Sequence, residues 1–330
     1  MTRATLSSTD GLDRKRTDAG RVPYQGRQTR VFSATFLALA ALAPGACVMP
    51  AAAPLPTPLL TWPDLTKRPR PEPDATVAYG PDAMHKVDVW VPAGAGPHPV
   101  VLMVHGGCWQ TSIADRRLMD WIAADLRASG VAVWNIDYRG VDRAGGGYPG
   151  TFADAAKATD RLLEHAAEHR LDTRKVVAVG HSAGGHLALW LAARSRLPAD
   201  SPLRTATAPL PIARIVSLGG LPDLEATANS ADNGCGTEVV ARLVGDRPDP
   251  YRDTSVPRLL PLGVPQDLVN GREDRIIPFR MATDYLEAST KAGDPVQLHT
   301  VPSTGHVELV APESAAWAQA KRIVLKEFGR

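Results

Sequence analysis

The sequence predicts an α/β fold in which one mostly parallel sheet carries helices on both faces. Three continuous apolar runs, at 100–104, 131–136 and 176–179, are typical of strands buried on both faces of a parallel sheet. Stretches with apolar residues at helical spacing follow these runs, and Gly130 ends the first of them as a helix C-cap would. Because strands and helices alternate along the chain, we expect a doubly wound architecture.

The alternation continues through most of the chain. Further strands are expected at 86–91, 215–218, 266–269 and 296–301, and helices at 115–129, 152–169, 184–194, 279–292 and 314–328. Residues 221–262 interrupt the pattern and contain several prolines. We interpret them as a small cap-like insertion over the carboxyl ends of the strands, where such sheets have their pockets.

Composition limits the classes of function. The 330 residues are 44% hydrophobic and 22% charged, which is ordinary for a globular protein and enough for one large domain plus an extension. The net charge is only +2, so nothing indicates a nucleic-acid partner. The three cysteines, Cys47, Cys108 and Cys235, are too few and too scattered for a zinc cluster, and we expect no metal.

The first part of the chain has the order of features that an export signal requires. A polar, basic leader precedes an apolar run at 31–43, and small residues that fit a cleavage site follow at 51–53. We therefore expect residues 1–53 to be a targeting segment and the protein to be periplasmic, secreted or lipid-anchored through Cys47. The run is too short for a stable membrane span. The alternative is a disordered tail on a cytoplasmic protein.

Proline is dense between this segment and the first expected strand. Eight prolines occur in residues 50–73, and proline lacks the amide hydrogen that helices and sheets need. We expect a linker at 54–78 and a single folded domain at 79–330.

A candidate nucleophile lies where a strand should meet a helix. The sequence Gly-His-Ser-Ala-Gly at 180–184 directly follows the apolar run 176–179 and precedes a helical stretch. In a nucleophile elbow the glycines permit a crowded turn that lifts the serine above the sheet, so the pattern indicates Ser182 as a nucleophile. The alternative is a glycine-rich turn with an unreactive serine.

A second glycine-rich loop follows another apolar run. His105-Gly106-Gly107-Cys108-Trp109 comes directly after 100–104 and is similar to loops whose backbone amides bind the oxyanion of a tetrahedral intermediate. We assign the oxyanion donors to the amides of Gly107, Cys108 and Ala183. His105 is expected to organise the loop, and Trp109 to form a wall of the acyl pocket unless it belongs to the core.

Ser182 needs a base and a carboxylate that orients it. In the chain order serine, acid, histidine, the base must come late, and His306 lies in a loop just after the expected strand 296–301. His299 lies inside that strand. Asp274, in the loop after 266–269, is the favoured acid and Glu273 is its rival.

These motifs resemble the α/β-hydrolase family. The quoted segments are HGGCW at 105–109, YRG at 138–140, GHSAGGHLALW at 180–190, NGREDRIIP at 270–278 and GH at 305–306. More narrowly, they resemble kynurenine formamidase-like and acetyl or feruloyl esterase-like members, which carry HGGxW. The resemblance covers about residues 79–328, and it implies an eight-stranded sheet and a triad of Ser182, Asp274 and His306. Cys108 departs from the HGGG form, although its amide can still donate.

The expected activity is hydrolysis of a small carboxylic ester through an acyl-enzyme, with no cofactor. A formamide is an alternative substrate, supported by HGGCW and weakened by the export signal. A peptidase of the prolyl oligopeptidase kind usually carries a propeller in front, which residues 1–78 cannot hold. A catalytically inactive binding module is the most distant alternative.

Two cysteines lie near the expected site. Cys108 is in the oxyanion loop and Cys235 is in the insertion, so a disulfide between them would hold the cap over the site. Disulfides persist in oxidising compartments. Two unrelated thiols remain the alternative, because spacing alone does not show that the Cα atoms approach closely enough.

Overall fold

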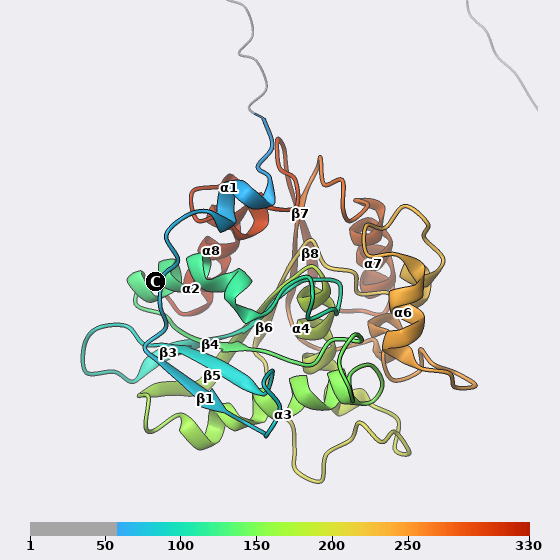
Figure 1. The fold of residues 1–330 in the computed structure, drawn as a ribbon, viewed down its shortest axis with the longest axis horizontal. Helices are drawn as coiled ribbons and strands as arrows, with labels where there is room; N and C mark the ends of the chain where they lie inside the picture. Colours follow the sequence, from blue (N-terminus) through green and yellow to red (C-terminus); the bar gives the residue numbers. More distant parts are fainter. Residues whose placement is uncertain (1–57) are drawn as a thin grey trace, which may run out of the picture. The chain divides into compact units, whose positions relative to one another are not determined.

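The structure is a computed structural model that describes residues 58–330. Its framework is one eight-stranded sheet with the strand order β1-β2-β4-β3-β5-β6-β7-β8 (Figure 1). The pairs β1–β2 and β2–β4 are antiparallel, and all neighbouring pairs from β4 to β8 are parallel. The prediction of a mostly parallel eight-stranded sheet is therefore confirmed.

Seven of the strands overlap the predicted runs, although β5 extends well beyond 176–179, and β1 was not predicted. The strand bounds are β1 Ala75–Ala78, β2 Lys86–Trp90, β3 His98–Val104, β4 Ala132–Ile136, β5 Leu171–His181, β6 Arg214–Leu218, β7 Gln266–Gly271 and β8 Val296–Val301.

The α-helices and the short 3₁₀ turns precede, connect and follow the strands. The helices are α1 Trp62–Thr66, α2 Asp120–Ala128, α3 Gly150–His165, α4 Ala183–Ala193, α5 Leu224–Ala228, α6 Thr237–Val244, α7 Arg280–Lys291 and α8 Ala315–Glu327. The turns are η1 Arg116–Met119, η2 Arg194–Arg196, η3 Val256–Leu259 and η4 Glu308–Val310.

Side chains of the central strands alternate between two cores. In β3, Val100, Leu102 and Val104 belong to one cluster, while Val101 and Met103 belong to the other. This is the period of two that a pleated strand imposes. Helices α3, α4, α6 and α7 supply the first cluster, and α2 and α8 the second (Figure 1). Both faces of the sheet are thus covered.

The prediction of a linker at 54–78 is wrong for residues 58–78, which the structure describes. Residues 62–66 form α1 and residues 75–78 form the edge strand β1, so the folded unit begins before Tyr79. Thr61 and Asp64 form a capping box at the start of α1, and Leu65 is fully buried. Proline is compatible with the first turn of a helix, so its density did not exclude one here. The predicted targeting segment 1–53 lies outside the described residues.

Residues 221–262 leave the sheet between β6 and β7. They form α5, α6 and η3, and Gly234 between the two helices donates its amide to the carbonyl of Ile276 at 2.7 Å. This segment therefore lies against the loop that follows β7.

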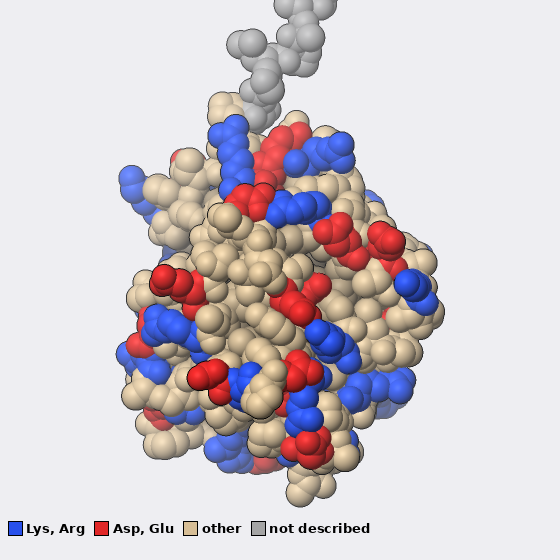
Figure 2. All heavy atoms as spheres, turned by 90° about the vertical axis from the view of Figure 1, so that its right-hand side faces the viewer, with Lys and Arg blue, Asp and Glu red and all other residues tan. Residues whose placement is uncertain are grey.

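Charges of both signs are mixed on the surface. In the face drawn in Figure 2, basic and acidic side chains are interspersed and no large area has a single sign. Within residues 58–330, no helix has both the length and the apolar character that crossing a bilayer would require.

Candidate active site

Ser182 lies at the turn between β5 and α4. Its φ of 55° and ψ of −122° are strained values for a residue with a side chain. The flanking glycines are sterically required, since a Cβ on Gly180 would lie 2.1 Å from the carbonyl oxygen of Gly184. A Cβ on Gly184 would lie 2.2 Å from the carbonyl oxygen of Val104. This is the geometry of a nucleophile elbow at the carboxyl end of a central strand.

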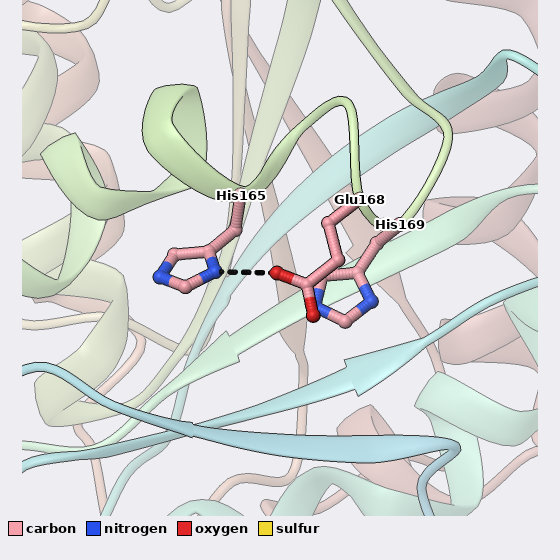
Figure 3. A group of neighbouring side chains, drawn as sticks. All are labelled: His165, Glu168 and His169. Carbon is pink, nitrogen blue, oxygen red and sulfur yellow. Dashed lines mark hydrogen bonds and ion pairs between the residues drawn. The ribbon is translucent and has the colours of Figure 1, made fainter.

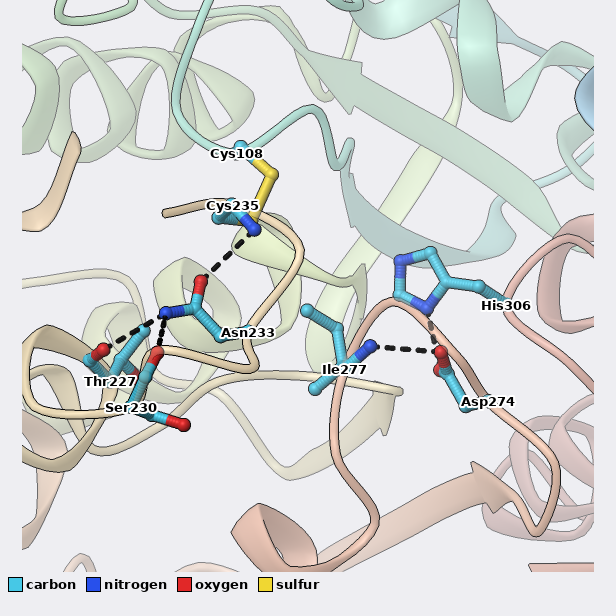
Figure 4. Close-up of a disulfide and its surroundings, with 8 residues drawn as sticks. All are labelled: Cys108, Thr227, Ser230, Asn233, Cys235, Asp274, Ile277 and His306. Carbon is cyan, nitrogen blue, oxygen red and sulfur yellow. Dashed lines mark hydrogen bonds and ion pairs between the residues drawn. A yellow bond between two sulfur atoms is a disulfide. The ribbon is translucent and has the colours of Figure 1, made fainter. Parts of the chain in front are cut away.

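His306 and Asp274 are brought together from the loops after β8 and β7. The Nδ1–H of His306 donates to Oδ2 of Asp274 at 2.7 Å, and both side chains are almost fully buried (Figure 4). The other carboxylate oxygen of Asp274 accepts the amides of Ile276 at 2.8 Å and Ile277 at 2.9 Å. The carboxylate is therefore held on both sides, and a proton on Nδ1 leaves Nε2 of His306 as the acceptor.

Ser182 and His306 line the same pocket. The three residues predicted from chain order thus converge at one end of the sheet.

The rival acid and base lie elsewhere. The exposed Glu273 accepts the amide of Thr304 at 3.1 Å and so joins the two loops, but it makes no contact with the imidazole of His306 in the described structure. His299 pairs with Asp267 at 2.7 Å, and both line a different pocket beside Arg214. The geometry thus favours Asp274 and His306 over these alternatives.

The other histidines near Ser182 are buried and engaged. The Nε2–H of His105 donates to Asp137 at 2.9 Å, as expected of a residue that organises its loop. The Nε2–H of His181 donates to the carbonyl of His306 at 3.2 Å, and burial lowers the pKa of His181 well below its usual range. Burial also lowers the pKa of His186 to about 4. His181 and His186 therefore remain neutral near pH 7.

The predicted oxyanion loop lies directly against the elbow. A Cβ on Gly106 would lie 3.0 Å from Cβ of Ser182, and Gly107 and Cys108 line the pocket beside Ser182. The backbone of Gly107 has a φ of 108° and that of Cys108 a φ of 51°. Among the hydrogen bonds between described residues, none uses the amide of Gly107, Cys108 or Ala183 as a donor. The predicted oxyanion donors are therefore unengaged among the described hydrogen bonds.

Cys108 and Cys235 form a disulfide, with their Cα atoms 5.2 Å apart (Figure 4). The bridge joins the oxyanion loop to the segment between β6 and β7 across 127 positions of sequence. Asn233 holds the Cys235 end of the bridge, because its side-chain oxygen accepts the amide of Cys235 at 3.0 Å. Its side-chain nitrogen donates to the carbonyls of Thr227 at 3.1 Å and Ser230 at 2.6 Å. The disulfide that the sequence left open is therefore present.

The pocket at Ser182 has a volume of about 270 Å³ and a mainly apolar wall. Its lining residues are Trp62, Thr66, Gly107, Cys108, Ile113, Ala114, Leu118, His181, Ser182, Gly234, Ile276 and His306.

The prediction that Trp109 forms a wall of this pocket is wrong. Trp109 is fully buried, and its ring packs edge-on against His186 with centroids 5.6 Å apart. Its backbone φ of 52° continues the left-handed turn at Cys108, and its side chain belongs to the core beneath the loop. The tryptophan that does line the pocket is Trp62, from the segment expected to be a linker. The capping box Thr61-Trp62-Pro63-Asp64 was the signal that could have revealed its helix.

Among the described residues, one group of side chains has an arrangement that could hold a metal ion. His165 is the last residue of α3, and Glu168 and His169 lie just beyond it, with ligand atoms within 4.8 Å of one another (Figure 3). Nδ1 of His165 lies 3.1 Å from a carboxylate oxygen of Glu168. Glu168 and His169 line a pocket with Asp74 and Arg127 that shares no residue with the pocket at Ser182. The group is therefore separate from the pocket at Ser182.

Solved structures of similar fold are esterases. A truncated carbohydrate esterase from gut microbiota aligns over 78% of this chain and 97% of its own, with 18% identity and a TM-score of 0.67. Esterase B of Lactobacillus rhamnosis covers 79% of this chain and 87% of its own, with 17% identity and a TM-score of 0.65. Esterase 2 of Thermogutta terrifontis, solved phosphonylated by sarin, covers 80% of this chain and 95% of its own, with 21% identity and a TM-score of 0.62.

A relative by sequence is a probable isoprenylcysteine alpha-carbonyl methylesterase of Arabidopsis thaliana, 29% identical over 114 residues. That match covers 34% of this chain and only 23% of the plant protein. The family model named BD-FAE matches residues 87–287, which is more than half of the chain. The chain therefore belongs to the BD-FAE family, whose members are α/β-hydrolase esterases.

Proposed function

We propose that this protein cleaves a small carboxylic ester through an acyl-enzyme on Ser182. His306 takes the hydroxyl proton at Nε2 as Ser182 Oγ attacks the carbonyl carbon, and the imidazolium returns it to the alcohol oxygen as that group leaves. Water then attacks the acyl-enzyme, again losing its proton to His306, and releases the carboxylic acid. Asp274 keeps the imidazole oriented and stabilises its positive charge.

The oxyanion of each tetrahedral intermediate would bind to backbone amides. Ala183 stands at the N-terminus of α4, where the helix dipole favours negative charge. Gly107 and Cys108 are assigned as the donors on the other side. No step needs a metal or an organic cofactor.

The observation that carries this proposal is the hydrogen bond between His306 and Asp274 at 2.7 Å, with His306 and the strained Ser182 on one pocket. The pocket volume of about 270 Å³ and its apolar wall favour a small, uncharged ester. The solved structures of similar fold carry esterase names, which supports an ester over a formamide or a peptide.

The test compares the purified protein on p-nitrophenyl esters, N-formylkynurenine and aminoacyl amides. We expect turnover of the short esters and labelling by a fluorophosphonate that Ser182→Ala abolishes. Turnover of the formamide alone would replace the ester proposal with an arylformamidase. Absence of labelling in the wild-type protein would favour a binding module.

We also propose that the protein is exported. The disulfide between Cys108 and Cys235 supports this, because such bonds persist in oxidising compartments. Intact-mass measurement after expression in a bacterial host should find a mature chain that lacks the first 46 to 53 residues. A cytoplasmic protein that retains Met1 would refute export.

A further inference from the structure

The segment at residues 58–66, which we call the N-terminal strap, lies beside the candidate catalytic histidine. The ring of Trp62 in α1 packs edge-on against His306, with centroids 6.2 Å apart, and against His181 at 6.1 Å. Trp62 and Thr66 line the pocket together with Ser182. One wall of the pocket therefore comes from the beginning of the described chain.

A single carboxylate joins the strap to the loop of His306. One oxygen of the buried Glu308 accepts the amide of Leu60 at 2.5 Å, and the other accepts the amide of Gly305 at 3.0 Å. Just after the strap, Arg68 makes a bidentate ion pair with Glu313. Leu65 anchors the helix from below in the core. The strap is thus fixed at several points, and Trp62 is held in place beside the imidazole.

The strap lies outside the residues that the family model matches. The family model begins at residue 87, whereas Trp62 lies upstream of it. The nucleophile, the oxyanion loop and the acid all lie within residues 87–287. The strap and His306 both lie outside the matched range. The strap lines the pocket and contributes no reacting group.

The position of Trp62 beside His306 indicates which part of the substrate it meets. In acyl transfer the histidine gives its proton to the departing alcohol oxygen, so the alcohol group lies on the histidine side of the bond that breaks. An apolar ring at this place would contact the alcohol group and leave the acyl group untouched. Half-buried tryptophan offers a large flat apolar surface for such a contact.

We propose that Trp62 is a specificity-determining residue that binds the alcohol part of the ester and favours an apolar alcohol, such as a benzyl or butyl group. This inference rests on the proposed ester hydrolysis. It names a substrate class for the same site: esters of a short acid with an apolar alcohol.

The experiment varies one side of the ester at a time. Methyl, butyl and benzyl acetate share the acetyl group, and p-nitrophenyl acetate and butyrate share the alcohol. In Trp62→Ala we expect kcat/KM for benzyl and butyl acetate to fall by about tenfold through KM, because an apolar contact is lost. The kcat/KM for methyl acetate should change by less than about twofold. The ratio of kcat/KM values for the two p-nitrophenyl esters should change equally little. Hydrolysis of the shared acetyl-enzyme should keep its wild-type rate.

Two further variants separate binding from structure. Trp62→Phe retains an aromatic wall and should recover most of the preference for benzyl acetate. Arg174→Ala loses an exposed ion pair with Asp172 that belongs neither to the strap nor to the pocket lining, and it should match the wild type. An unchanged preference among the acetates in Trp62→Ala, or a change confined to the acyl series, would overturn the assignment. Wild-type protein that releases no acid from any of these esters would instead overturn the proposed function, and this inference with it.

Discussion

Cys108 and Cys235 are covalently joined, so the loop that carries two candidate oxyanion donors is tied to the segment between β6 and β7. The same segment donates the amide of Gly234 to the carbonyl of Ile276 at 2.7 Å, and Ile276 in turn donates its own amide to Asp274 at 2.8 Å. A short chain of contacts therefore joins the oxyanion loop to the acid of the triad. The two halves of the site, which come from distant parts of the sequence, are held to each other through this segment.

The first prediction concerns the nucleophile. Ser182→Ala should lower kcat by about 10⁶-fold while leaving the circular dichroism spectrum unchanged, since only the attacking oxygen is removed. The measurement is p-nitrophenyl acetate hydrolysis at saturating substrate. The exposed Ser195 provides the matched control, and Ser195→Ala should behave as wild type. A Ser182→Ala protein with near-normal turnover would contradict the proposed mechanism.

The second prediction concerns the acid. Asp274→Asn should lower kcat by about 10⁴-fold, because an amide in place of the carboxylate favours the wrong tautomer of His306. Glu273→Gln has the same length and should retain most of the activity, since the Glu273 carboxylate accepts the amide of Thr304 and makes no contact with the imidazole of His306 in the described structure. The measurement compares kcat of the Asp274→Asn and Glu273→Gln variants on the same ester. If Glu273→Gln is the crippled variant, the acid is misassigned although the mechanism stands.

The contrast between what the sequence predicted and what it missed has a physical basis. Ser182, Asp274 and His306 follow strands, and strands are recognisable from local apolar runs. Parallel strands bring their carboxyl ends to one edge, so the loops after β5, β7 and β8 had to meet. The location of the candidate triad therefore required only local patterns and chain order.

The pocket wall depended on tertiary packing. Trp109 looked exposed to substrate from its position after the oxyanion glycines, yet two left-handed residues carry its side chain into the core. Trp62 lay in a proline-rich stretch, and nothing in the local sequence indicated that its helix returns to His306. Neither outcome can be read from periodicity, because both are set by contacts between residues distant in the chain.

The third prediction uses a buried carboxylate far from the reaction. Burial raises the pKa of Asp120 to about 7, even though Arg70 lies 3.1 Å away and favours the charged form. The folded protein then holds a proton that the unfolded chain, with a pKa near 3.8, has already lost. Stability should therefore fall as the pH rises from about 4 to 7, and change little from this group above that range.

Asp120→Asn tests this contribution. Between pH 5 and pH 8, the unfolding free energy of the variant should decline by roughly 2–3 kcal/mol less than that of the wild type. Urea unfolding at both pH values measures it. Asp284→Asn, at an exposed position, should leave the decline as it is in the wild type. An equal decline in Asp120→Asn and the wild type would show that Asp120 is charged throughout.

The fourth prediction concerns the disulfide. Its loop of 127 positions is long, and the chain-entropy model assigns such a loop a stabilisation of roughly 5 kcal/mol at most. Cys108→Ser with Cys235→Ser should therefore lower the urea midpoint. The double variant should also lower kcat on p-nitrophenyl acetate, because the oxyanion donors would lose their fixed position and preorganised donors contribute strongly to the rate. The wild-type protein, unfolded without reductant, should show no titratable thiol from Cys108 or Cys235.

Substrate binding and catalysis should respond differently to the loss of this bridge. Trp62, Ile113 and Leu118 in the apolar wall are not part of the bridge, so we expect KM to change less than kcat. Reduction of the wild type should reproduce the double variant, and reduction of the double variant should have no further effect. Full kcat in the double variant would show that packing alone holds the amide of Cys108. The role of the bridge would then be confined to stability.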